Sequence, residues 1–137
     1  MEYFNQSQLK RYPDLRSHTC TMDYTEIEKF QRALCSRFTA AFVSTSPDDK
    51  IGFARSTAGR QPINGLRHPN TPGTSGWYIW CGEFFSESPD FFDPQHASHF
   101  YEDMPDTSHL LGLAPGYRFL LAGNYLDVWY DKKLLDV

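Results

Sequence analysis

Histidine residues in the C-terminal half are the first candidates for chemistry. His96 and His99 stand three residues apart, so both side chains would lie on one face of a helix, a spacing that can bind a metal ion. Further ligands could come from His109, Asp90, Asp93 and Glu102. The HExxH motif is absent, and two histidines on a helix are more often solvated than metal-bound. A metal-assisted hydrolase is therefore the least favoured function, and we expect no metal.

Other catalytic patterns are weaker still. The sequence contains no GxSxG nucleophile motif, and its glycines form neither GxGxxG nor GxxxxGK[ST], so no nucleotide site is indicated. Glu83, Glu87 and Asp90 could act as paired carboxylates, but acidic residues next to a strand end are usually solvated. We therefore predict a protein that is not an enzyme and that carries no cofactor.

Cysteine usage and hydropathy indicate the compartment. Cys20, Cys35 and Cys81 are an odd number at long spacings, which fits reduced thiols better than disulfide bonds. No apolar run reaches the length of a membrane span, and Met1–Lys10 is polar, without the apolar core of a signal peptide. We expect a cytoplasmic protein with no membrane partner. The length of 137 residues suits a single domain, 1–137.

Charge is divided unevenly along the chain. The net charge is -4, but residues 1–82 carry 10 basic and 7 acidic side chains, whereas residues 83–137 carry 3 basic and 10 acidic ones. An acidic protein is a poor ligand for nucleic acid, because that binding depends on neutralising phosphates. The acidic half can instead attract a partner with a basic surface, or it can simply keep the protein soluble.

The first element that must position these residues is a helix over Thr25–Phe42. Its apolar residues recur at steps of three and four, and Thr25 with Glu28 forms a T-x-x-E capping box. Glu28 and Arg32 can form an ion pair one turn apart. Next, 41–44 and 51–55 read as strands joined by a turn, which predicts a hairpin. Residues 56–75 are rich in Gly and Pro and predict a long loop, either binding or mobile.

The later elements are strands with one or two short helices. Gly76–Glu83 is an aromatic strand with Trp77, Ile79 and Cys81 on one face and two further aromatic residues, Tyr78 and Trp80, on the other. A helix is expected over 94–103, followed by a short turn through Leu111. Two strands, 117–122 and 125–130, flank Gly123-Asn124 and predict a second hairpin. The fold class is α+β, a mainly antiparallel sheet with an N-terminal amphipathic helix and one or two further short helices.

Several segments together resemble a known family. They are FVS (42–44), IGFARS (51–56), TSGWYIWCGE (74–83), LAPGYRFLL (113–121) and DVWYD (127–131). In this succession the chain, over about residues 41–137, resembles the immunity protein 33 family of bacterial polymorphic-toxin systems. The resemblance implies a protein that binds and blocks a toxin delivered by neighbouring cells. It implies no catalytic residue.

The sequence thus predicts an immunity protein that occludes a cognate protein toxin by stoichiometric contact, the toxin having a basic surface. The candidate contact residues are Glu83, Glu87, Asp90 and Asp93 after the aromatic strand, with Trp129 and Asp131 near the chain end. The alternative is a small-ligand-binding or scaffolding domain that uses the aromatic strand as a stacking platform. The oligomeric state stays open.

Overall fold

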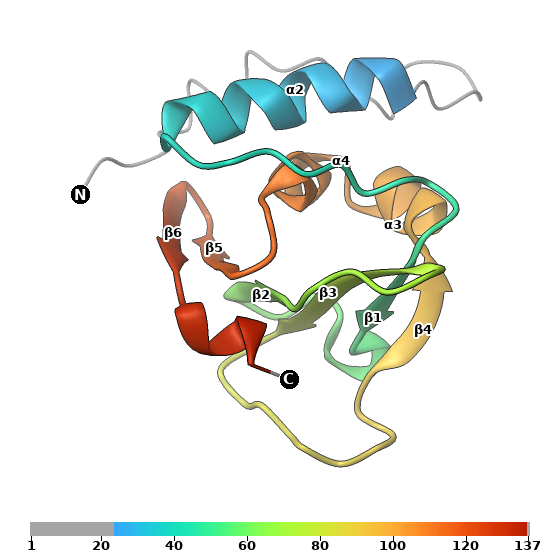
Figure 1. Cartoon of the computed structure of the whole chain (residues 1–137). Helices are drawn as coiled ribbons and strands as arrows, with labels where there is room; N and C mark the ends of the chain where they lie inside the picture. The colour runs from blue at the N-terminus through green and yellow to red at the C-terminus, as the bar shows by residue number, and fades with distance from the viewer. Residues whose placement is uncertain (1–23, 137) are drawn as a thin grey trace.

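The chain forms one six-stranded sheet with helices on one side. A computed structural model describes residues 24–136 (Figure 1); the polar opening Met1–Lys10 and Cys20 lie outside them. The strand order is β4-β1-β3-β2-β5-β6, and only β1 and β3 pair in parallel. The elements are α2 (Tyr24–Arg37), β1 (Lys50–Phe53), η1 (Arg55–Thr57), β2 (Ile63–Arg67), β3 (Thr74–Cys81), β4 (Asp93–His96), α3 (Ala97–Asp103), α4 (Pro105–Ser108), η2 (His109–Gly112), β5 (Tyr117–Ala122), β6 (Tyr125–Tyr130) and η3 (Lys132–Leu135). The predicted α+β fold with a mainly antiparallel sheet is confirmed.

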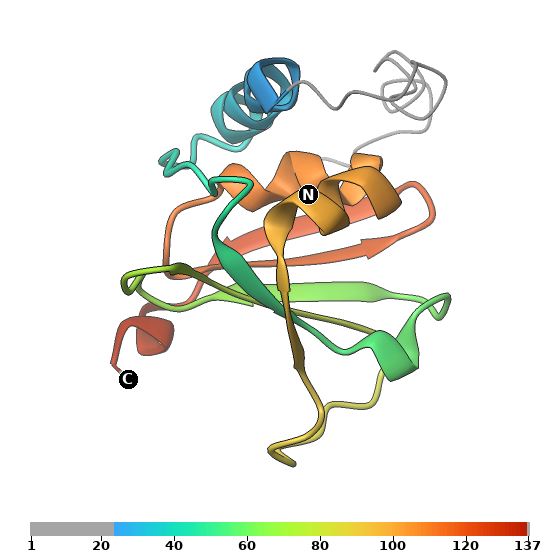
Figure 2. The same cartoon turned by 90° about the vertical axis from the view of Figure 1, so that its right-hand side faces the viewer.

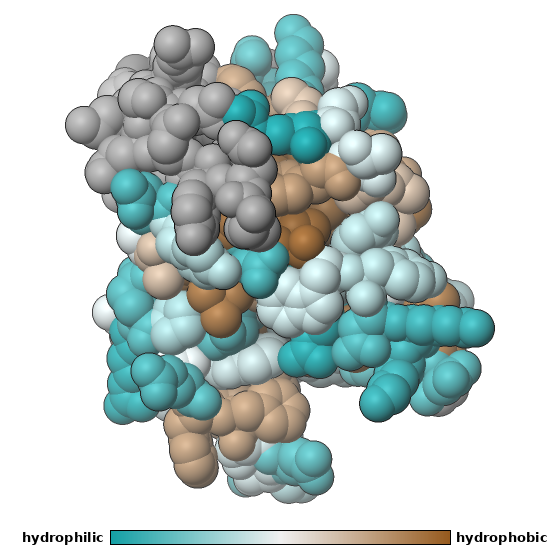
Figure 3. Space-filling model, turned by 90° about the vertical axis from the view of Figure 1, so that its left-hand side faces the viewer, coloured by the Kyte–Doolittle hydropathy of each residue, from teal (hydrophilic) through white to brown (hydrophobic). Residues whose placement is uncertain are grey.

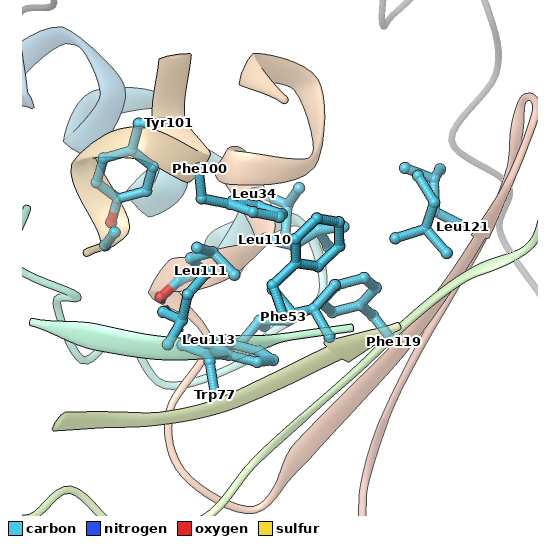
Figure 4. Packing of buried hydrophobic residues seen from close by; sticks show 14 of the residues in the cluster. Leu34, Phe53, Trp77, Phe100, Tyr101, Leu110, Leu111, Leu113, Phe119 and Leu121 are labelled. Carbon is cyan, nitrogen blue, oxygen red and sulfur yellow. Dashed lines mark hydrogen bonds between the residues drawn. The ribbon is translucent and has the colours of Figure 1, made fainter. Parts of the chain in front are cut away.

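The two faces of the sheet differ in what covers them. Helices α2, α3 and α4 lie over one face, here called the inner face (Figures 1 and 2). The main core fills the space between these helices and the sheet (Figure 4). Fully buried side chains in it include Leu34, Phe100, Leu110, Trp77 and Phe119. On the opposite face, the outer face, the described residues that pack against the sheet come from the segment between β3 and β4 and from η3.

Strand β3 alternates between these faces as its sequence predicts. Trp77, Ile79 and Cys81 belong to the main core, whereas Trp80 belongs to a second cluster on the outer face. That cluster consists of Ala54, Leu66, Trp80 and Leu134, with Phe91 and Phe92 packed against it. Tyr78 is 38% exposed. The outer aromatic residues of β3 are therefore covered unequally, by the protein's own loop and C-terminal turn.

Helix α2 is shorter than predicted. It ends at Arg37 rather than Phe42, and Thr39 adopts a positive φ of 52° that ends the helix. Thr25 already lies within the helix, so it is not the N-terminal cap that the capping-box pattern predicted. The predicted ion pair is confirmed, because Nε of Arg32 lies 2.8 Å from Oε2 of Glu28.

The predicted hairpin between 41–44 and 51–55 is wrong. Phe42 makes only an isolated bridge with Leu113, and β1 pairs with β3 and β4 instead. The backbone of this segment has other partners: the N–H of Val43 donates to the carbonyl of Gly112. The carbonyl groups of Val43 and Ser44 accept hydrogen bonds from the guanidinium group of Arg67. A distant side chain therefore takes the place of a strand partner.

The predicted loop over 56–75 is also wrong, because it contains η1, the central strand β2 and the start of β3. Strand β2 (Ile-Asn-Gly-Leu-Arg) has little of the β-branched and aromatic composition that marks strands. Gly65 is required by packing, since a Cβ atom there would lie 2.2 Å from the ring of Phe119 in β5. Interior packing, not local preference, makes this segment a strand.

The C-terminal half differs from expectation at one element. The helix predicted over 94–103 begins only at Ala97, because Asp93 and Pro94 lie in β4 and pair with Phe53 and Gly52 of β1. The short turn predicted through Leu111 corresponds to α4, which begins at Pro105, and to η2, which follows it. The second hairpin is confirmed, with Ala122 opposite Tyr125 across the two-residue turn. In residues 24–136, no helix combines the length and hydropathy needed to cross a membrane.

Burial of His109 predicts a pH-dependent stability. Its side chain is 1% exposed, its ring centroid lies 4.9 Å from that of Phe30, and burial lowers its pKa to about 4. Between this pKa and the ordinary value near 6.5 the unfolded chain binds more protons, so stability falls as the pH falls. We expect about 2 kcal/mol of loss between pH 7 and 5 from this residue, measured by urea denaturation.

The control for this effect is a histidine on the surface. His109→Gln should flatten the pH dependence of the unfolding free energy between pH 7 and 5, and His99→Gln, which removes an exposed histidine and keeps His109, is the variant to compare it with. Equal slopes for the parent protein and His109→Gln would show that His109 is not responsible.

Candidate partner-binding surface

The six predicted contact residues fall into two groups on the structure. Glu83, Glu87 and Asp90 are exposed in the segment between β3 and β4, and Asp93 is half-buried at the start of β4. Trp129 lies near the end of β6 and Asp131 directly after it, at the edge of the sheet opposite to β4. The structure therefore brings the four acidic residues of the first group into one segment and leaves the last two apart.

Glu83, Glu87 and Asp90 of the first group lie on residues 82–92 (Gly-Glu-Phe-Phe-Ser-Glu-Ser-Pro-Asp-Phe-Phe), here called the acidic aromatic loop, and Asp93 follows it in β4. Its first residue, Gly82, has a φ of +90°, which allows the sharp turn away from β3. The N–H of Gly82 donates to the carbonyl of Pro62 (2.7 Å), and Nδ2 of Asn64 donates to the carbonyl of Gly82 (2.9 Å). Residues next to the sheet therefore fix the root of the loop.

Three aromatic rings fasten the loop to the outer face. The ring of Phe85 lies 5.0 Å from that of Trp80, and the ring of Phe92 lies 5.1 Å from that of Tyr78, both edge-on. Phe91 and Phe92 contact each other at 4.9 Å. These edge-to-face contacts suit aromatic pairs and hold the loop against β3.

Phe84 is the exception among the four phenylalanines of the loop. Its side chain is 73% exposed, whereas its neighbour Phe85 is 44% exposed and contacts Trp80. The space-filling view shows hydrophobic side chains at the lower end of the molecule, the end at which the acidic aromatic loop lies (Figures 1 and 3). The loop therefore presents Phe84 to solvent for most of its surface and Phe85 for less than half, from a base that the packed rings hold in place.

The charge of the loop has one sign. Glu83, Glu87 and Asp90 are its only charged side chains, and all three are exposed. The tip between them has local order: the N–H of Ser88 donates to Oγ of Ser86 (3.1 Å), and the N–H of Phe91 donates to the carbonyl of Ser88 (3.0 Å). An apolar side chain within a cluster of carboxylates can contact a protein surface that combines an apolar depression with basic residues.

The second group is already engaged within the protein. Nη1 of Arg118 donates to Oδ2 of Asp131 (3.1 Å), and this hydrogen bond lowers the pKa of the carboxyl group. Oδ1 of Asp131 accepts from the N–H of Lys133 and so caps η3. The guanidinium carbon of Arg118 lies 5.8 Å from the ring centre of Trp129, which is 39% exposed. Asp131 thus has a structural role at the base of the C-terminal turn.

The candidate metal ligands do not come together. The rings of His96 and His99 lie 6.3 Å apart, but His109 is buried next to Phe30 of α2. Among residues 24–136, no three His, Cys, Asp or Glu side chains form a group that could hold a metal ion. The hydrolase alternative therefore lacks its third ligand in the part of the chain that the structure describes.

The fold and the acidic aromatic loop define a small α+β domain whose exposed chemistry suits contact with another protein. Comparison with protein families identifies the family of this domain. The model of the Imm33-like domain matches residues 30–131, and the chain belongs to this family of immunity domains. The resemblance drawn from the sequence is confirmed. No curated protein and no solved structure matches the chain.

Sequence reasoning missed the aromatic part of this surface. Phe84 and Phe85 follow the acidic Glu83 directly, and successive side chains in an extended segment point in opposite directions. That alternation indicates that one ring faces inward and the other outward. It does not say which, because the choice depends on where Trp80 and Phe92 lie.

Proposed function

We propose that this chain is an immunity protein that neutralises a cognate toxin by binding it one to one through the acidic aromatic loop. It acts by covering the active or substrate-binding surface of the toxin and catalyses no reaction. The observation that carries the proposal is Phe84, which is 73% exposed and stands between carboxylate groups on a loop whose neighbouring rings are packed against the sheet.

The packing of the loop favours binding for an energetic reason. If the loop were flexible, ordering it on binding would cost conformational entropy and would weaken the affinity for the partner. Here Phe85, Phe91 and Phe92 already hold the loop on the outer face, so Phe84 is presented from an ordered base. Burial of one such aromatic side chain in a fitted pocket contributes about 2 kcal/mol or more at an interface.

The charge of the loop indicates the chemistry of the partner. Three exposed carboxylates without a basic neighbour in the loop favour a toxin whose surface carries Lys and Arg around an apolar pocket. Asp93 extends this acidic surface to the start of β4. We propose that Trp129 and Asp131 contribute only to contacts with a toxin large enough to span the outer face.

The stacking-platform alternative is less well supported. On the outer face of β3, Trp80 is only 7% exposed and contacts Phe85, while the ring of Tyr78 contacts those of His68 and Phe92. The protein's own side chains therefore occupy the aromatic surface that a small ligand would need.

Co-expression tests the proposal. Cells that produce the toxin encoded next to this gene should survive when they also produce this chain, and should die when they produce an unrelated protein. A purified mixture should give a one-to-one complex on gel filtration. Death at the same rate with and without the chain would contradict the proposed function.

A variant in which the three carboxylates of the loop are neutralised tests the role of the loop. Glu83→Gln, Glu87→Gln and Asp90→Asn together should slow association with the toxin about tenfold or more at low salt, and less at high salt, because charge steering is screened. The matched control neutralises three exposed acids on α3 and α4, with Glu102→Gln, Asp103→Asn and Asp106→Asn, which changes the net charge equally. Stopped-flow measurement of both variants compares the rates. Equal slowing in both would show that total charge, not the loop, attracts the toxin.

A further inference from the structure

The two edges of the sheet are protected to different degrees. β4 has only four residues and contains Pro94, which cannot donate a backbone hydrogen bond to a further strand. β6 has six residues, Tyr-Leu-Asp-Val-Trp-Tyr, and no Pro, Lys or Arg among them. Within residues 24–136 the structure places no strand beyond β6. This edge therefore has the properties of a template for another strand.

The register of the last hairpin shows which backbone groups of β6 are available. Ala122 and Tyr125 flank the two-residue turn, where the flanking residues of such a hairpin exchange hydrogen bonds. At the far end the N–H of Asp131 donates to the carbonyl of Gly116 (2.7 Å). Hydrogen-bonded positions alternate along an antiparallel pair. The odd-numbered residues of β6 therefore bond to β5, and Leu126, Val128 and Tyr130 direct their backbone groups away from it.

We propose that two copies of this chain associate by antiparallel pairing of their β6 strands, about a twofold axis at Val128. In this register Val128 lies opposite Val128 of the second copy, and Leu126 lies opposite Tyr130. All three outward positions then form hydrogen-bonded pairs. Each pair also joins residues on the same face of the sheet, so the two sheets continue into one.

Charge selects this register over its neighbour. An axis at Asp127 would still pair Leu126 with Val128 of the second copy, but it would leave Tyr130 opposite the turn residue Asn124 and would place the two Asp127 carboxylates directly opposite each other, which is destabilising. With the axis at Val128, Asp127 lies opposite Trp129 of the second copy instead. Asp127 thus disfavours the competing alignment and is tolerated in the proposed one.

The side chains along the edge support a second copy as the occupant. Val128 packs against the main core while remaining partly exposed, so its counterpart would extend an existing apolar surface. Tyr130 is 51% exposed and would lie against Leu126 of the second copy, on the inner face. The acidic aromatic loops of both copies stay accessible on the shared outer face, so the pairing is compatible with the proposed function and independent of it.

Analytical ultracentrifugation of the full chain tests the pairing. The parent protein should sediment as a dimer at about 100 μM, a concentration that detects small interfaces. Val128→Pro removes an N–H that points away from β5, so the hairpin should persist. The dissociation constant of the dimer should rise about tenfold or more. Val128→Thr keeps the N–H and should remain dimeric. A monomeric parent protein, or an unchanged dimer with Val128→Pro, would overturn the proposal.

Disulfide trapping tests the register. In a background with Cys20→Ser, Val128→Cys should form a covalent dimer on mild oxidation, because a hydrogen-bonded pair has a Cα separation of about 5.5 Å, within the range of a disulfide bond. Tyr130→Cys is the matched control, since its counterpart is four residues away along the strand. Cross-linking of Tyr130→Cys but not Val128→Cys would exclude the register.

If the parent protein is monomeric and Val128→Pro weakens toxin binding, the edge accepts a strand of the toxin and the dimer is refuted.

Discussion

Replacement of Arg67 by Met is expected to cost about 3–5 kcal/mol of folding free energy, a large part of the stability of a domain this size. The Arg67 side chain is fully buried, and all its acceptors are neutral oxygen atoms. These are the carbonyl oxygens of Ser75 (2.8 Å), Val43 (2.8 Å), Leu113 (2.7 Å) and Ser44 (3.1 Å), and Oδ1 of Asn70 (3.4 Å). Methionine fills a similar volume but leaves these acceptors without their donor.

The charge of Arg67 persists in spite of its burial. Desolvation lowers its pKa to about 10, which still leaves the group protonated at neutral pH. The guanidinium group connects β2 to the segment after α2 and to the residue that follows η2. Lysine offers only three donors around one nitrogen atom, so Arg67→Lys should also destabilise the fold, though less than Arg67→Met.

Guanidinium chloride denaturation measures this effect. Arg55→Met is the matched control, because Arg55 is exposed on η1 and its replacement should change the unfolding free energy by less than about 0.5 kcal/mol. A failure of Arg67→Met to fold agrees with the expectation. An unfolding free energy within about 1 kcal/mol of the parent value would show that these hydrogen bonds are not essential.

The same residue explains why a central strand was missed in the sequence. Elements with a clear local pattern were predicted correctly, including the Gly123-Asn124 hairpin and the two faces of the aromatic strand β3. In β2 the residues suit partners that are distant in the sequence. Gly65 accommodates the ring of Phe119, and Arg67 donates hydrogen bonds to carbonyl groups far along the chain. No local pattern encodes such requirements, so this segment resembled a loop.

The candidate site also depends partly on contacts between residues that are far apart in the sequence. Composition located the acidic segment, since Glu83, Glu87 and Asp90 are close in sequence and therefore close in space. Composition could not show that Asp131 is bonded to Arg118, a contact across two paired strands. Nor could it separate the exposed Phe84 from its packed neighbours, because that depends on how the loop returns along the outer face.

Phe84 should dominate the affinity for the toxin under the proposed function. We expect Phe84→Ala to raise the dissociation constant of the complex about 100-fold, in the range of an aromatic residue at the centre of an interface. Most of this change should appear as faster dissociation, because short-range packing affects the lifetime of a complex more than the rate of encounter. The free energy of unfolding should hardly change, since the side chain is 73% exposed in the free protein. Surface plasmon resonance gives the rates and urea denaturation the stability.

Two variants separate this role from a general loss of aromatic surface. Tyr130→Ala removes another exposed aromatic side chain, on β6, and should leave toxin affinity within about twofold of the parent value. Phe85→Ala removes a ring that contacts Trp80, so it should lower stability and also weaken binding by loosening the base of the loop. The opposite result would be an unchanged dissociation constant for Phe84→Ala and weakened binding for Tyr130→Ala. It would place the contact on β6 and refute the acidic aromatic loop as the binding surface. Phe84 and the three acids thus have separable effects, because the ring governs dissociation and the carboxylates govern association.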